Sequence, residues 1–309
     1  MTTGDGAPVT PRETGAGDKL PRPSTKGEWA TAFARSAALG WRCRGRFADV
    51  ERFCFFIGYP RSGHSLVGSL LNAHREVLIA HELDALGYVE HRFGRSQLYA
   101  LLLERDQVFA SIGRRWMGYD YVVPNQFQGR WSRLRVIGDK RGHVSTYRLH
   151  EHPEVLDRLR RVVGVPIRVV HVTRNPYDNI ATMARRAAEA RVRRTGQSAD
   201  GSGPELSEAV ERYAELCSWI DAIRRRLDPE ELHDVVYEEF VARPAESLTE
   251  LCRFLDVEAE TAYVADCAGI VWPQVRRARD GVVWSDADRE RVEEVIGRYR
   301  VLGGYSWTA

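Results

Sequence analysis

The chain has 309 residues, of which 43% are hydrophobic and 28% are charged, and its formal net charge is +2. This is the composition of an ordinary globular protein that is long enough to bury a sizeable core. A net charge so close to zero gives no bulk electrostatic argument for a nucleic acid partner, and no apolar run approaches the roughly 20 residues that span a bilayer.

Residues 1–26 are rich in Gly, Pro and Thr and lack both a periodic apolar pattern and the apolar segment of a signal peptide. We expect a disordered tail over 1–26 and a single domain over 27–309, which starts with a short helix at about 28–39. The five cysteines are odd in number and never spaced C-x-x-C, which favours free thiols in a reducing compartment. These features predict a soluble, cytoplasmic protein.

A strand, a glycine-containing turn and a helix are predicted next. Residues 53–57 form a short apolar run that is typical of a strand buried on both faces. The turn Gly58-Tyr-Pro-Arg-Ser-Gly63 is rich in residues that break regular structure, and leucines at helical spacing follow it. This order aims backbone N–H groups and the positive end of a helix dipole at an anion.

The spacing of the glycines in this turn indicates which kind of anion it could bind. Gly58, four residues, Gly63 and then His64-Ser65 match the phosphate loop G-x-x-x-x-G-K-[ST], except that histidine replaces the lysine. A nucleotide triphosphatase uses that lysine on the β and γ phosphates and the following hydroxyl on magnesium, whereas here the cation is Arg61, inside the loop. We interpret the turn as an anion site that is not obviously built for ATP. The alternative is an ordinary strand-to-helix turn.

Strands and helices alternate along the rest of the chain. Further strands are predicted at 77–80, 134–138, 165–173 and 233–237, and further helices at about 96–115, 153–163, 176–194, 205–227, 244–255 and 286–300. The aromatic segment 116–131 is expected to be a loop, either near the substrate or on the plain surface, and 195–204 a flexible connector. The pattern predicts an α/β fold with three layers, α/β/α, around a central, mostly parallel sheet of about five strands, as in the P-loop nucleotide triphosphatases.

Polar residues stand where several of these strands end. The turn 58–65, His81-Glu82, residues 139–143 and Arg174 each come directly after a predicted strand. Because ligands of open α/β sheets bind outside the carboxyl ends of the strands, we expect these segments to converge on one edge.

Two motifs resemble those of the sulfotransferases that use 3′-phosphoadenosine 5′-phosphosulfate (PAPS), and the resemblance covers most of residues 50–300. The turn Gly58–Ser65 is similar to the family's 5′-phosphosulfate loop, and Val172-Thr-Arg-Asn-Pro-Tyr-Asp-Asn-Ile-Ala-Thr182 is similar to its 3′-phosphate motif. Val236-Tyr-Glu-Glu-Phe240 is similar to a third segment, whose tyrosine approaches the adenine. PAPS has two separated anionic groups, which fits two anion sites at different strand ends.

The resemblance implies a set of donor-binding residues within one sulfotransferase domain. They are Pro60, Arg61, Ser62, Gly63, His64 and Ser65 at the 5′ end, Arg174 and Thr182 at the 3′-phosphate, Tyr237 at the adenine, and Arg276 and Arg277 in a basic segment over the 3′-phosphate. The basic segment departs from the family's usual order, and His64 stands where the family usually has threonine or serine. A neutral His64 ring either donates an N–H to the phosphate or merely fills space.

The implied reaction is in-line attack of an acceptor hydroxyl on the sulfur of PAPS, without a metal, with 3′,5′-adenosine bisphosphate as the product. The attack needs a base for the hydroxyl proton and a cation or donor on the departing oxygen. Residues 72–82 resemble the segment that carries the glutamate base in some branches of the family, which makes Glu82 the first candidate, with His81 and His143 as rivals. Lys140 and Arg61 are the candidate cations.

Two other functions stay open at this point. A P-loop kinase or nucleotide triphosphatase would use Asp139 as a magnesium carboxylate, although we interpret Asp139 as a structural partner of Lys140 or Arg141. A catalytically inactive nucleotide-binding protein would bind the bisphosphate without turnover. No His or Cys group has the spacing of a zinc site. The acceptor, whether a small molecule, carbohydrate or lipid hydroxyl, and the oligomeric state, a homodimer included, are left open.

Overall fold

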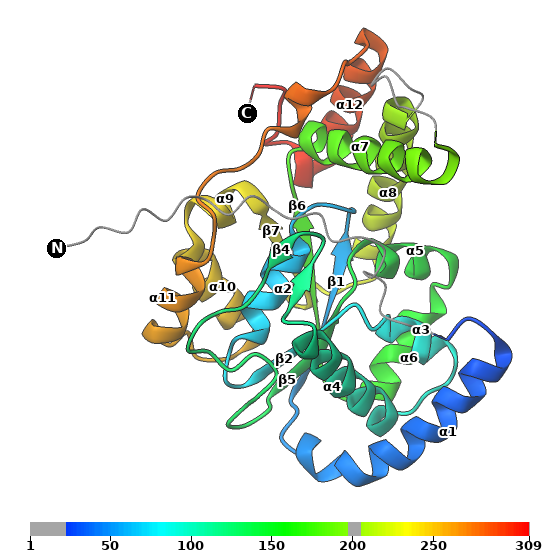
Figure 1. Ribbon diagram of the computed structural model, residues 1–309, viewed down its shortest axis with the longest axis vertical. Helices are drawn as coiled ribbons and strands as arrows, with labels where there is room; N and C mark the ends of the chain where they lie inside the picture. The colour runs from blue at the N-terminus through cyan, green and yellow to red at the C-terminus, as the bar shows by residue number, and fades with distance from the viewer. Residues whose placement is uncertain (1–22, 197–204, 309) are drawn as a thin grey trace.

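The computed structural model describes residues 23–196 and 205–308 (Figure 1). The predicted disordered tail lies outside these residues except for its last positions, and most of the predicted connector at 195–204 also lies outside them. None of the helices in the described ranges is long and apolar enough to cross a membrane.

A five-stranded sheet forms the centre of the fold. Its strands stand in the order β2 (Val77–His81), β5 (Val136–Lys140), β1 (Arg52–Gly58), β6 (Ile167–Thr173) and β7 (Leu232–Val236). Every neighbouring pair is parallel, so the carboxyl ends of all these strands meet at one edge. The predicted three-layer α/β fold with a central parallel sheet is confirmed.

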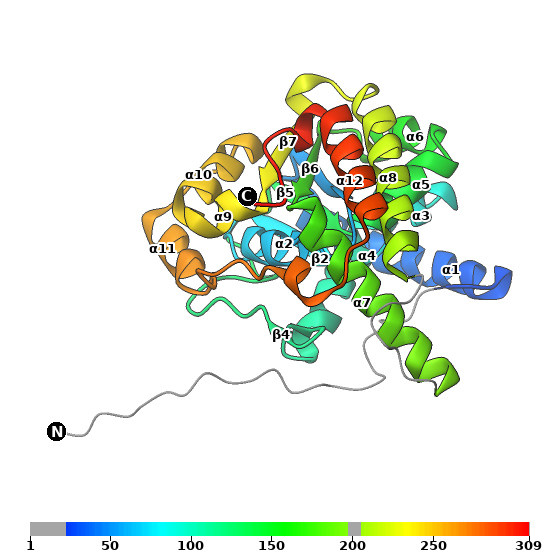
Figure 2. The same cartoon turned by 90° about the horizontal axis from the view of Figure 1, so that it is seen from above.

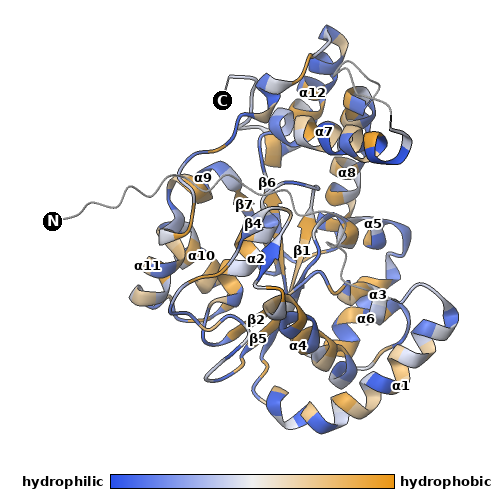
Figure 3. Ribbon diagram, in the orientation of Figure 1, coloured by the Kyte–Doolittle hydropathy of each residue, from blue (hydrophilic) through white to orange (hydrophobic). Residues whose placement is uncertain are grey.

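Alternate side chains of β1 enter two separate cores. Phe53, Phe55 and Ile57 pack into one core, and Cys54 and Phe56 pack into the other, on the opposite face of the sheet. Because both faces are covered, the strand is buried from Phe53 onward, and it appears in the sequence as an unbroken apolar run. Figure 3 shows the hydrophobic colour concentrated in these central strands.

Helices cover both faces of the sheet (Figure 2). One face carries α2 (His64–Asn72), α9 (Tyr237–Ala242), α10 (Pro244–Leu255) and α11 (Thr261–Gly269). The other core is built with α3 (Ala85–Glu90), α4 (Arg95–Ser111), α5 (His143–Glu151), α6 (Glu154–Val163), α7 (Pro176–Thr195), α8 (Glu205–Arg224) and α12 (Asp286–Arg298). A further helix, α1 (Lys26–Cys43), packs against α4. All five cysteines are free thiols, as predicted, and four of them are buried.

Some elements differ from the prediction. Tyr237, which we expected to end a strand, is the first residue of α9. The segment 116–131, predicted as a loop, begins within a short hairpin of β3 (Arg115–Trp116) and β4 (Tyr119–Asp120). The short helices α3, α5, α9 and α11 were not predicted, because two turns or so hold too few apolar residues to reveal a helical period.

Candidate functional site

The polar residues at the ends of the strands and directly after them meet at the carboxyl edge of the sheet, as predicted. Glu82 directly follows β2, and its backbone N–H donates to the carbonyl of Lys140, the last residue of β5, at 3.1 Å. The turn after β1 contacts α7, which follows β6, since the Asn179 amide donates to the Pro60 carbonyl at 2.7 Å. The parallel arrangement of the strands therefore places all of these segments around one site.

The turn after β1 presents unpaired backbone donors. Gly63 caps α2 in a left-handed conformation with φ of 97°, which glycine adopts without strain. The successive N–H groups from Arg61 to Ser65 donate no hydrogen bond to any other group in the described part of the chain. A run of free N–H groups at the start of a helix is suited to an anion.

A buried cation lies beside this turn. The Lys140 side chain is only 1% exposed, and its ammonium is 2.9 Å from the Ser65 hydroxyl and 3.0 Å from a carboxylate oxygen of Glu82. Its stem passes Gly68 of α2, where a Cβ would come within 2.7 Å of Lys140 Cγ. Arg141 pairs with the other carboxylate oxygen of Glu82. Glu82 is thus held between two cations at the edge of the sheet.

The charges of this cluster determine its protonation. Burial alone would raise the pKa of the Glu82 carboxyl, but the Lys140 ammonium and the Arg141 guanidinium hold that pKa well below its ordinary value of 4.5. Burial lowers the pKa of Lys140 from 10.5, and the Glu82 carboxylate partly offsets this effect. Glu82 is therefore ionised at neutral pH.

Two of these residues have strained backbones. Arg61 and Glu82 adopt left-handed conformations with φ of 68° and 60°, which residues other than glycine rarely adopt. Burial, and then the nearby Arg186, lowers the pKa of Arg61. Backbone strain of this kind concentrates at ligand and active sites.

Three histidines surround the same cluster. Burial and the Lys140 charge lower the pKa of His64 and of His81 well below 6.5, and burial and Arg141 lower the pKa of His143 to about 4. His64 Nδ1 lies 3.3 Å from the Ser62 hydroxyl. His81 Nε2 lies 3.5 Å from the Lys140 ammonium, and Nδ1 of His143 is buried without a hydrogen-bond partner. All three rings are neutral at neutral pH.

The second predicted motif lies at the end of β6. The Arg174 guanidinium donates to the Arg276 carbonyl at 2.6 Å and lies 3.5 Å from the Arg61 carbonyl. Its Nε is buried and has no hydrogen-bond partner, and the guanidinium carbon is 5.7 Å from the centre of the Tyr237 ring. The Tyr237 ring in turn lies against Gly63, where a Cβ would come within 2.2 Å of it. Tyr237 therefore connects the two predicted anion sites.

The remaining predicted residues have fewer contacts that relate them to the predicted 3′-phosphate site. The Thr182 side chain is 9% exposed, and its hydroxyl donates to the Asp178 carbonyl one turn earlier on α7. The Arg276 and Arg277 side chains are exposed, and Arg276 touches Arg174 through its backbone carbonyl. Their binding roles stay predictions.

The interpretation of Asp139 as a partner of Lys140 or Arg141 is wrong: among the described residues its carboxylate forms no ion pair or hydrogen bond with either side chain. Its carboxylate accepts three hydrogen bonds, from the backbone N–H groups of Leu83, Asp84 and Ala85, at 2.8 to 2.9 Å. These groups lie at the start of α3, where an acidic side chain satisfies free N–H groups. Asp139 thus fixes the turn that carries Glu82.

Several residues at the site are not predicted as site residues from the sequence. Arg141, which pairs with Glu82, follows the predicted Lys140 but is interpreted from the sequence only as a partner for Asp139. Trp116 of the hairpin lies 5.0 Å, ring to ring, from His81, and the buried Tyr121 lies near Ser65 and Arg61. The aromatic content of 116–131 was the only available signal. Among the described residues, no group of three or more His, Cys, Asp or Glu side chains is placed to hold a metal ion.

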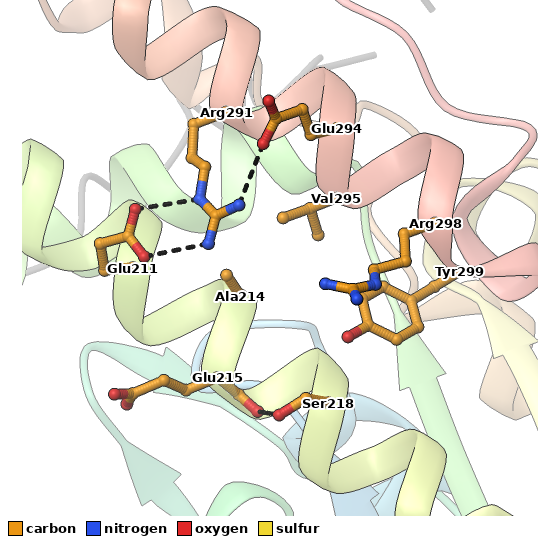
Figure 4. A pocket seen from close by; sticks show the side chains of 9 residues that line it. All are labelled: Glu211, Ala214, Glu215, Ser218, Arg291, Glu294, Val295, Arg298 and Tyr299. Atoms are coloured by element: carbon orange, nitrogen blue, oxygen red, sulfur yellow. Dashed lines mark hydrogen bonds and ion pairs between the residues drawn. The ribbon is translucent and has the colours of Figure 1, made fainter.

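A groove of about 580 Å³ lies away from this site, between α8 and α12 (Figure 4). Its apolar floor includes Ala214 and Val295, and its rim carries charges of both signs. Arg291 is paired there with both Glu211 and Glu294 at 3.0 Å. We assign it no role, because its rim charges largely neutralise one another.

Comparisons with known proteins agree with the predicted family. The sequence pattern of the Sulfotransferase family matches residues 54–261, which is more than half of the chain. No curated protein matches the chain significantly by sequence. A sulfotransferase domain from the curacin biosynthetic pathway is 16% identical, with a TM-score of 0.51, and the match covers 84% of this chain and 99% of that domain. Sulfotransferase STF9 from Mycobacterium avium is 13% identical, with a TM-score of 0.50, and the match covers 89% of this chain and 84% of that one. At such identities the structural likeness concerns the fold alone.

Proposed function

The chain belongs to the sulfotransferase family, and we propose that it transfers a sulfuryl group from PAPS to the hydroxyl of an acceptor molecule, in the cytoplasm and without a metal. The observation that carries this proposal is the pair of anion sites at the ends of β1 and β6. Free backbone N–H groups line the first site, and a guanidinium with an unpaired buried Nε stands at the second.

The two sites suit the two ends of PAPS. The N–H groups from Arg61 to Ser65 and the positive end of α2 would bind the 5′-phosphosulfate. Arg174 would bind the 3′-phosphate, because a planar guanidinium matches phosphate oxygens and its Nε is still available. Tyr237 contacts both Gly63 and Arg174, and in this proposal its ring would contact the adenosine.

When bound, PAPS supplies an activated sulfuryl group attached to a good leaving group. Lys140 and Arg61 would stabilise the negative charge that grows on the bridging oxygen. The Lys140 ammonium already contacts Ser65 of the anion loop, 2.9 Å away, so a small movement brings it to a sulfuryl group bound there.

Glu82 is our candidate for the base that accepts the acceptor proton. Its low pKa makes it a weak base as long as Lys140 and Arg141 both pair with it. A Lys140 ammonium that turns toward the sulfuryl group would weaken its pairing with Glu82 and raise the pKa of that carboxyl. The same cation would thereby assist the leaving group and increase the basicity of Glu82 when the donor is in place.

Two observations weigh against a nucleotide triphosphatase. Ser65 occupies the position whose hydroxyl binds magnesium in a phosphate loop, but here it contacts the Lys140 ammonium. Asp139, the candidate magnesium carboxylate, accepts three backbone hydrogen bonds instead.

A transfer assay tests the proposed activity. Purified protein is incubated with radiolabelled PAPS, EDTA and a panel of phenols, sugars, lipids and peptides that carry hydroxyl groups. We expect label to move to at least one class of acceptor and the bisphosphate to accumulate. Bisphosphate binding with no transfer to any acceptor class would favour an inactive binding protein.

A further inference from the structure

Arg174 is held from both sides by the same short segment near the end of the described chain. On one side, the Thr173 hydroxyl lies 3.2 Å from the hydroxyl of Tyr305. On the other, the Asn175 side-chain amide donates to the Ser306 carbonyl at 2.9 Å. Residues separated from Arg174 by more than a hundred positions therefore fix its backbone.

Tyr305 also contacts Glu238, the residue that follows Tyr237. One carboxylate oxygen of Glu238 accepts a hydrogen bond from the Asn175 N–H at 2.9 Å, and the other lies 3.1 Å from the Tyr305 hydroxyl. Tyr237, the neighbour of Glu238, contacts both Gly63 and Arg174. Burial raises the pKa of Tyr305, and the nearby Glu238 charge adds to this effect. The Tyr305 hydroxyl thus stays protonated and able to donate.

A third connection runs through Arg279. Its side chain is 3% exposed and pairs with both carboxylate oxygens of Asp178, at 2.9 and 3.1 Å. It also donates to the carbonyls of Ser306 and Trp307 at 3.0 and 2.6 Å. The Trp307 ring packs edge-on against Tyr177 of α7 with ring centres 5.1 Å apart.

We propose that residues 305–307 form a positioning latch for the 3′-phosphate site, and this inference rests on the proposed function. The latch joins three segments that are far apart in the sequence, namely 173–178, 237–238 and 276–279. Each segment supplies a contact to Arg174, as a flanking residue, as the ring of Tyr237 or as the carbonyl of Arg276. A guanidinium fixed in advance loses less conformational entropy on binding a phosphate.

Residues 305–307 could either position Arg174, as the latch does, or only stabilise the fold, and these two roles predict different ligand selectivity. If these residues only stabilise the fold, a substitution there would lower the affinity for all nucleotides alike. If they position Arg174, the same substitution would lower the affinity for ligands with a 3′-phosphate and leave the affinity for ligands without one unchanged. The ratio of the affinities for 3′,5′-adenosine bisphosphate and adenosine 5′-phosphate therefore separates the two.

The variant that tests this is Tyr305→Phe, which removes one hydroxyl and keeps the ring. Its matched control is Tyr299→Phe, because Tyr299 lies on the same stretch of chain but lines the groove between α8 and α12 (Figure 4). Both ligands are measured by calorimetry, with displacement titrations for the weaker one. We expect Tyr305→Phe to weaken bisphosphate binding by up to roughly tenfold, because the free energy of the lost hydrogen bond to the Glu238 carboxylate is the most that this change can remove from the binding of the 3′-phosphate. The affinities for adenosine 5′-phosphate, and both affinities of the control variant, should stay unchanged.

A second variant, Trp307→Phe, tests the packing of the latch while keeping an aromatic ring in place. It should lower the affinity ratio in the same direction. An unchanged ratio in both variants, or an equal loss for both ligands, would overturn the latch while leaving the proposed function intact. A native protein that does not prefer the bisphosphate would instead contradict the proposed 3′-phosphate site, and the latch with it.

Discussion

The Lys140 ammonium lies 3.0 Å from a carboxylate oxygen of Glu82, although 58 positions separate the two residues in the sequence. They meet because β2 and β5 are adjacent parallel strands, in which His81 and Lys140 are register partners. The pair joins the proposed base to the proposed cation, so each residue controls the charge state of the other.

Replacing Glu82 with Gln should lower kcat by about 10²- to 10⁴-fold, the usual contribution of a general base. The variant keeps the shape of the side chain, so its affinity for the bisphosphate should change little. Steady-state kinetics with an acceptor from the transfer assay, together with calorimetry, measure both effects. Glu104→Gln, at a surface ion pair with Arg35, is the matched control. Full turnover by the Glu82 variant would move the assignment to His81 or His143.

Arg174→Ala should weaken bisphosphate binding by about 2–4 kcal/mol, because it would remove the charged partner that we propose for the 3′-phosphate. Arg193→Ala, an exposed arginine near the end of α7, the helix that begins two residues after Arg174, should have no such effect. Calorimetry of both variants gives the comparison. Equal affinities for the native protein and the Arg174 variant would show that the 3′-phosphate binds elsewhere.

Gly63→Ala should disrupt the anion loop for two reasons. The residue has a φ of 97°, and the new Cβ would lie 2.2 Å from the Tyr237 ring. Gly113→Ala separates the two effects, because Gly113 has a φ of 70° and nothing within 4 Å of a Cβ. Both variants should lose about 1 kcal/mol of stability from backbone strain. Only Gly63→Ala should also lose bisphosphate affinity, and a similar loss in the Gly113 variant would rule out a specific role for the Tyr237 contact.

The buried neutral histidines should make the protein less stable in mild acid. Burial and Lys140 hold the pKa of His64 below 6.5 in the folded state, so below that pH the unfolded chain binds a proton that the folded chain does not. The free energy of unfolding should therefore fall from pH 7 to pH 5, by up to about 1.4 kcal/mol per pH unit for this histidine. Urea unfolding of His64→Gln should show a shallower slope, with the exposed His150→Gln as the control. An unchanged slope would mean that the pKa of His64 is the same in the folded and unfolded states, which would contradict the effect of burial.

The sequence predicts the sheet well, because parallel strands buried on both faces leave unbroken apolar runs such as 53–57. It also predicts the turn before α2 and the start of α7, where Gly63, Asn175 and Pro176 have fixed geometric roles. Short helices such as α3 and α9 are missed because one or two turns show no period.

Contacts between distant segments could not be predicted in the same way. Nothing local indicates that Asp139 caps α3, or that Arg141 pairs with Glu82, since both contacts depend on how β2 and β5 are aligned. The contacts of residues 305–307 with 173–175 are likewise set by tertiary packing. The local sequence pattern thus indicates which residues could take part in binding or catalysis, and the fold determines which of them lie together.

Calorimetric titration with 3′,5′-adenosine bisphosphate in the presence of EDTA tests the central claim most directly, with ATP and magnesium as the comparison ligand. We predict that the bisphosphate binds without metal, and much more tightly than ATP with magnesium. Binding of magnesium ATP alone, with no heat from the bisphosphate, would contradict the proposed use of PAPS.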